Sequence, residues 1–177
     1  MSSYASPNSS AKHLIRRRPA LTLVEVVVST LIVGLMTVAA LDGLGAATRS
    51  SDSAGNRGVA QGLADDLMAE VLATAYHDPN GSAVFGLEAG EVAPRVNFDD
   101  VDDFHGWNQK PPQAADGTTI ADRTDWRQRV TVERVVPTNP IQLTAGASDQ
   151  GAKRICVKIE YKDVALAEQY AIVADTD

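Results

Sequence analysis

A single carboxylate, Glu25, lies within an otherwise apolar run from Leu21 to Leu41. A carboxylate near the centre of a membrane helix costs about 2.5–3.5 kcal/mol on insertion scales, so such a residue usually has a cationic partner. The cost falls toward the edge of the membrane, and tolerance at the edge is the alternative explanation for Glu25, the fifth residue of the run. The chemistry that this residue type and position predict is the pairing of charges inside a membrane.

A second group of carboxylates lies within five residues of the chain, at Asp99, Asp100, Asp102 and Asp103. Oxygen-rich loops bind Ca²⁺, so these four residues are candidate calcium ligands. Their spacing is not that of an EF-hand, because no glycine occupies the sixth position and no glutamate closes the loop. We expect a solvated acidic loop or a helix-capping turn here, with a calcium site as the alternative and no other cofactor.

Histidine and cysteine give little support for catalysis or zinc binding. His77 and His105 are the only histidines beyond residue 20, and they are not part of a His-x-x-x-His or Glu-x-x-His pattern. The sequence also lacks a Gly-x-Ser-x-Gly elbow and a phosphate-binding glycine-rich loop. Cys156 is the one cysteine, so an intramolecular disulfide is excluded, and we expect a half-buried thiol. We therefore predict that the chain is not an enzyme.

Charge is distributed unevenly along the 177 residues, whose net charge is −7. Four of the 16 basic residues lie in the first twenty positions, at Lys12, Arg16, Arg17 and Arg18, and the first twenty contain no acidic residue. Residues 21–177 contain the remaining 12 basic residues and all 23 acidic ones, so their net charge is −11. An acidic body of this kind repels nucleic acid, so nucleic acid is not an expected partner. Arginines beside an apolar run indicate that the N-terminus stays in the cytoplasm.

The apolar run is long enough to cross a membrane. Its 21 residues, Leu21–Leu41, span about 31 Å as a helix, whereas the apolar part of a signal peptide has about 7–15 residues. Its valines would favour a strand in water, but in lipid the backbone must satisfy its own hydrogen bonds, so a helix is expected. Apolar residues then recur four apart from Val59 to Leu72, which predicts an amphipathic continuation over residues 42–75, weakened near Gly43–Gly45 and Gly55–Gly58.

The C-terminal part, residues 76–177, reads as a loop-rich region followed by an antiparallel sheet. Glycine, proline and asparagine predict turns between residues 76 and 125, with short strands near 83–85 and 91–98. Alternating apolar residues predict longer strands at Trp126–Val136, Arg154–Tyr161 and Ala165–Val173, the last two forming a hairpin, with a connecting loop over residues 137–152. The fold class is therefore α+β: one long N-terminal helix, half membrane-embedded and half amphipathic, packed on a small sheet.

The N-terminal motif resembles the prepilin-type signal of type IV pilins and type II secretion pseudopilins. The family pattern is a short basic leader, a glycine, and then Phe-Thr-Leu-(Ile/Val)-Glu at the start of an apolar helix. Here Arg16-Arg17-Arg18-Pro19 precede Ala20, and Leu21-Thr22-Leu23-Val24-Glu25 open the helix. Ala20 replaces the usual glycine and Leu21 the usual phenylalanine, and both are small chemical changes. The resemblance covers residues 16–41 closely, and it implies a pilin-like fold for the remainder.

The resemblance implies how the chain is processed and where it goes. A prepilin peptidase would cleave between Ala20 and Leu21, remove the leader of residues 1–20 and methylate the new amine of Leu21. Glu25 would then pair with the N-terminal amine of a neighbouring subunit. The implied partners are other pilin or pseudopilin subunits, the peptidase, the assembly platform of the inner membrane, and lipid. The implied location is the bacterial inner membrane, with a single pass and an extracytoplasmic C-terminal domain, and then a pilus or pseudopilus.

A further segment bears on the kind of subunit. Residues Asn97–Trp107 are similar to part of some minor pilins, including those of mannose-sensitive haemagglutinin pili, which implies a minor structural subunit. Two alternatives remain open. One is a signal-anchored extracytoplasmic binding domain unrelated to filaments, and the other is a secreted protein cut by ordinary signal peptidase after Ala40. Glu25 separates them, because only a filament subunit needs a carboxylate at that position, and in a signal peptide it would interrupt the apolar core.

Overall fold

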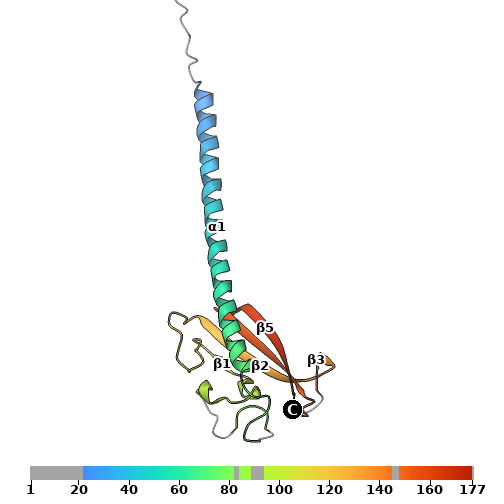
Figure 1. Cartoon of the computed structure of the whole chain (residues 1–177). Coiled ribbons are helices and arrows are strands. Elements are labelled where there is room, and N and C mark those ends of the chain that lie inside the picture. The colour runs from blue at the N-terminus through green and yellow to red at the C-terminus, as the bar shows by residue number, and fades with distance from the viewer. Residues whose placement is uncertain (1–21, 82–83, 89–93, 145–147, 177) are drawn as a thin grey trace, which may run out of the picture. The chain divides into compact units, whose positions relative to one another are not determined.

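The computed structural model describes residues 22–81, 84–88, 94–144 and 148–176. The chain divides into two compact units, Met1–Ala47 and Thr48–Asp177. Helix α1, Leu23–Leu72, begins in the first unit and ends in the second (Figure 1). The predicted helix was slightly longer, to Ala75, and α1 continues without a break through Gly43–Gly45 and Gly55–Gly58, where weakening was predicted.

In the first unit α1 is apolar and exposed all round. Every large apolar side chain from Leu23 to Leu44 is at least 47% exposed. The hydroxyl groups of Thr30 and Thr37 donate to helix carbonyls three or four residues earlier, at 2.8–3.0 Å, so their polar atoms are satisfied within the helix. By length and composition α1 can cross a membrane. An apolar surface of this extent requires lipid or other protein around it.

The second unit contains a five-stranded antiparallel sheet on which the last turns of α1 pack, so the predicted α+β arrangement is confirmed (Figure 1). The sheet order is β1-β2-β4-β5, and β3 pairs with the end of β2. The strands are β1 (Asn108–Gln109), β2 (Trp126–Val136), β3 (Asn139–Leu143), β4 (Ala152–Tyr161) and β5 (Val164–Ala174).

The β4–β5 hairpin forms as predicted. Its two turn residues, Lys162 and Asp163, have φ values of 51° and 62°, which is the left-handed conformation that a tight two-residue hairpin turn requires. On β4 the side chains alternate, with Ile155, Val157 and Ile159 buried and the intervening residues partly exposed.

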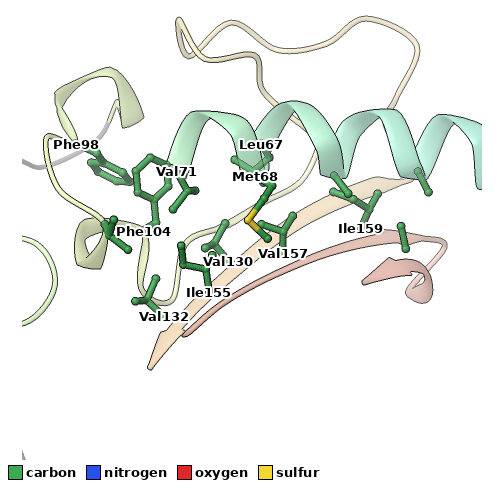
Figure 2. Close-up of a cluster of buried hydrophobic side chains, with 14 of the residues drawn as sticks. Leu67, Met68, Val71, Phe98, Phe104, Val130, Val132, Ile155, Val157 and Ile159 are labelled. Atoms are coloured by element: carbon green, nitrogen blue, oxygen red, sulfur yellow. The ribbon is translucent and has the colours of Figure 1, made fainter. Parts of the chain in front are cut away.

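The hydrophobic core lies between α1 and the inner face of the sheet. Figure 2 shows Leu67, Met68 and Val71 of α1 among Val130 of β2 and Val157 of β4. The predicted apolar face of α1 is thus correct from Ala60 to Val71. Its last member is wrong, because Leu72 lies off this face and is 48% exposed.

One predicted loop differs from the structure. Residues 137–152 were expected to form a loop, but Pro137 and Thr138 form a two-residue turn and β3 follows. Pro140 lies within β3, where proline is tolerated because only one side of the strand is paired.

The strand expected near residues 91–98 is also wrong over its described part. Arg95–Asn97 form a 3₁₀ turn, η1, in which the amide of Asn97 donates to the carbonyl of Pro94 at 3.0 Å. The Arg95 side chain is buried and forms an ion pair with Glu70 of α1. This ion pair holds the turn in place, and the described part of the segment forms no hydrogen bonds of the kind that join strands in a sheet. The strand expected near Ala83–Phe85 is absent from Val84 and Phe85, and Ala83 lies outside the described residues.

Candidate functional site

Glu25 lies in the first turn of α1, and its side chain is exposed in the single chain. The Thr22 hydroxyl accepts a hydrogen bond from the amide of Glu25 at 3.3 Å, which is the geometry of an N-cap. The spacing of Thr22 and Glu25 is that of a capping box, a signal that sequence reasoning missed. Because the cap uses the backbone amide, it leaves the carboxylate of Glu25 available for another partner.

The other residues of the predicted processing site are Ala20 and Leu21, and those of the leader are Arg16, Arg17 and Arg18. All five lie outside the described residues. Glu25 is therefore the one member of the motif's assigned residues that the structure places. It is the only charged residue of α1 before Asp42, so the apolar surface around it offers no cation of its own.

The acidic cluster forms a different site, in the second unit. Asp100 Oδ1 accepts hydrogen bonds from the amides of Asp102 and Asp103 at 2.7 and 3.1 Å, an Asx turn at the start of the 3₁₀ helix η2, Asp102–Phe104. Asp103 Oδ2 accepts in return from the amides of Asp99 and Asp100 at 3.0 and 3.3 Å. The capping turn was one of the predictions for this segment, and this geometry matches it.

The predicted solvation of the cluster is wrong for three of its members. Asp100, Asp102 and Asp103 are at most 3% exposed, and only Asp99 is half-buried. The cluster is held under the end of α1, because Ala75 exchanges backbone hydrogen bonds with Asp99 and Val101 at 3.1 and 3.0 Å. Among the described residues, no three His, Cys, Asp or Glu side chains are arranged to hold a metal ion. The calcium prediction therefore gains no geometric support from these residues.

A buried lysine completes this cluster, and sequence reasoning missed it. The ammonium group of Lys153 contacts the Asp102 carboxylate and the carbonyl of Tyr76, and it lies 4.4 Å from the centre of the Tyr76 ring. The side chains of Lys153 and Asp102 are 2% and 4% exposed. A signal was present, because the alternation that buries Ile155 and Val157 also turns Lys153 inward.

Burial and the neighbouring charge of Asp102 raise the pKa of Asp100 to about 7. The backbone hydrogen bonds and Lys153 act in the opposite direction but do not cancel the burial. An unfolded aspartate titrates near 4, so between about pH 4 and 7 the folded chain holds a proton that the unfolded chain has lost. The stabilisation from Asp100 is thus complete below pH 4 and is lost as the pH rises through 7.

We expect Asp100→Asn to remove this pH dependence, because the amide oxygen can still accept both backbone hydrogen bonds. Unfolding by urea in nonionic micelles, followed by the fluorescence of Trp107 and Trp126, measures it. The difference in free energy of unfolding, wild type minus variant, should fall between pH 4 and 7 by at most about 1.4 kcal/mol per pH unit. Asp102, Asp103 and Lys153 face Asp100 in both proteins. Parallel pH profiles would contradict a raised pKa.

The remaining candidate residues do not assemble into a reaction site. His77 Nε2 lies 2.9 Å from Asp175 Oδ2, whereas His105 Nδ1 lies 3.3 Å from the amide of Val132, so the two histidines belong to separate environments. Cys156 is half-buried, as predicted, and burial raises the pKa of its thiol, which disfavours the reactive thiolate.

Comparison with known proteins found no matching family model, no matching curated protein and no matching solved structure. Functional assignment therefore rests on the N-terminal motif, on the exposed apolar half of α1, and on the packing of the second half on the sheet.

Proposed function

We propose that the chain is a structural subunit of a type IV pilus or type II secretion pseudopilus, in the manner of a minor pilin or pseudopilin. A prepilin peptidase removes residues 1–20 and methylates Leu21, and the apolar half of α1 then holds the subunit in the inner membrane, N-terminus inside. The chain acts as an assembly component and not as an enzyme. Its partners are other subunits, contacted through α1, and the assembly platform.

The observation that carries the proposal is Glu25, an acidic residue in the first turn of a helix that is otherwise apolar to Leu41. Lipid alone gives this carboxylate no partner, whereas the free amine of a neighbouring mature subunit is a cation at a suitable depth. The exposed apolar surface of Leu23–Leu44 supports the same assignment, because it can contact lipid before assembly and the helices of neighbouring subunits within the filament.

A signal-anchored extracytoplasmic binding domain is the second candidate. It explains the membrane span and the folded second unit equally well, since both follow from a helix that joins an anchor to a domain. It gives no role to Glu25, and a plain anchor would be improved by its removal.

Processing tests the proposal. Intact-protein mass spectrometry from the native host should find a mature chain that starts at Leu21 and carries a methyl group on its amine. Ala20→Gly, which restores the residue usual in the family, should be cleaved at least as completely. Ala20→Leu, which places a bulky residue before the cleaved bond, should accumulate uncut. A mature start near Leu41, or an uncut wild-type leader, would contradict the assignment.

A further inference from the structure

A cavity of about 260 Å³ lies beside the second half of α1, next to the core. One wall comes from α1 and the other from the segment of residues 113–120, with Arg95 and Gln128 contributing. Its apolar lining includes Leu63 and Ile120, which are half-buried, and Leu67, which belongs to the core. The cavity lies entirely within the second unit and includes none of the residues that the proposed filament function uses.

The charged side chains that line this cavity are one arginine and two acidic residues, Arg95, Glu70 and Asp66. Arg95, 3% exposed, is bound by both carboxylate oxygens of Glu70 at 2.7 and 2.9 Å, and it also donates to the carbonyl of Gln113 at 3.2 Å. Arg95 and Glu70 therefore neutralise each other. Asp66 also lines the cavity, is exposed, and forms no ion pair or hydrogen bond among the described residues. The lining thus combines apolar side chains with the polar residues Gln113 and Gln128, and it carries one negative charge, that of Asp66, that no cation pairs among the described residues.

We propose that this cavity binds an alkylammonium group, of the kind carried by a lysine side chain or a small primary amine. The apolar stem would lie along Leu63 and Ile120, and the ammonium group would pair with Asp66. A compact cation on a flexible apolar stem suits such a site, because the stem gains from burial while the charge keeps an acidic partner. A neutral apolar ligand would leave the Asp66 carboxylate without a cationic partner, and an anionic ligand would be repelled by the negative charge of Asp66.

The test titrates the full chain in nonionic micelles with three probes. N-acetyl-lysine amide represents a protein lysine, pentylammonium represents a small amine, and N-acetyl-norleucine amide is the uncharged control. The readout is the amide NMR shifts of Gln113, Ala114 and Ala115, which lie in the cavity wall. We expect saturable shifts with the charged probes only.

Two substitutions make the test specific. Asp66→Asn should raise the dissociation constant of the charged probes by about tenfold, through the loss of the ion pair. Asp65→Asn is the matched control, because Asp65 is the adjacent carboxylate of α1, bonds Gln61 and Gln169, and does not line the cavity. It should leave the dissociation constant unchanged.

Each outcome decides the proposal. Binding of both charged probes, weakened by Asp66→Asn alone, supports an ammonium site in general. Binding of N-acetyl-lysine amide alone supports a protein lysine as the natural source, and binding of pentylammonium alone supports a small amine. No saturable shift with either charged probe, or equal affinity in Asp66→Asn and wild type, would overturn the proposal. Failure here would leave the mature start at Leu21, and with it the filament assignment, unaffected.

Discussion

Glu25→Ala should lower the incorporation of the chain into filaments at least tenfold while leaving cleavage and membrane insertion intact. Inside a bundle of apolar helices the carboxylate and a neighbour's amine attract strongly, because little water screens them. Removing one partner leaves the other charge buried and unpaired, at a cost of about 3–5 kcal/mol, which corresponds to more than two orders of magnitude in an equilibrium. Apolar helix packing in lipid offsets little of this, because lipid is as apolar as the helices.

The measurement compares variants in the sheared filament fraction, or by crosslinking, at equal abundance in the membrane. Glu25→Gln should be incorporated as poorly as Glu25→Ala, because glutamine keeps the size of the side chain but loses its charge. Glu25→Asp keeps the charge and should retain part of the wild-type incorporation. Asp52→Ala is the matched control, since Asp52 is an exposed acidic residue of the same helix beyond the apolar run. All of these variants keep the backbone amide that Thr22 caps. Equal incorporation of Glu25→Gln and wild type would remove the main reason for assigning the chain to a filament.

Lys153→Met should destabilise the second unit by about 3–5 kcal/mol, because it leaves the Asp102 carboxylate buried without its cation. A loss of this size is a large part of the 5–15 kcal/mol that typically stabilises a folded domain. Urea unfolding followed by tryptophan fluorescence measures it. The methionine keeps most of the apolar stem, so the effect reports the charge and its hydrogen bonds rather than a cavity.

Two further variants identify the cause. Lys158→Met removes a lysine from the same strand, but its ion pair with Glu168 is about one-third exposed on both sides, so its loss should cost at most about 1 kcal/mol. Adding Asp102→Asn to Lys153→Met should recover part of the stability, because the stranded charge is then removed. A cost for Lys153→Met no greater than that for Lys158→Met would show that the buried pair does not stabilise the fold.

Patterns with a fixed period made the elements predictable from the sequence. The apolar run and the four-residue spacing from Val59 to Val71 gave α1, and the alternation around Ile155 and Val157 gave β4 and its hairpin with β5. These signals are strong because one face of each element must leave water, and the period of the backbone then dictates the residue types. The position of Glu25 in the first turn of an apolar helix follows from the same local rule.

Contacts between segments distant in the sequence decided the rest. The segment near residue 95 is a turn and not the expected strand, because Arg95 forms an ion pair with Glu70, 25 residues away in the sequence. The expected solvated loop is a buried cluster, because Lys153 pairs with Asp102, 51 residues away in the sequence. Local propensity carries no information about such pairings, because a charged residue is buried only where its partner is brought to it. The sequence alone thus determined the helix, the main strands and the place of Glu25 in the first turn of the apolar helix. The tertiary structure decided which aspartates are buried, that Arg95 and Glu70 neutralise each other, and that Asp66 lines a cavity with no ion pair or hydrogen bond to any other described residue.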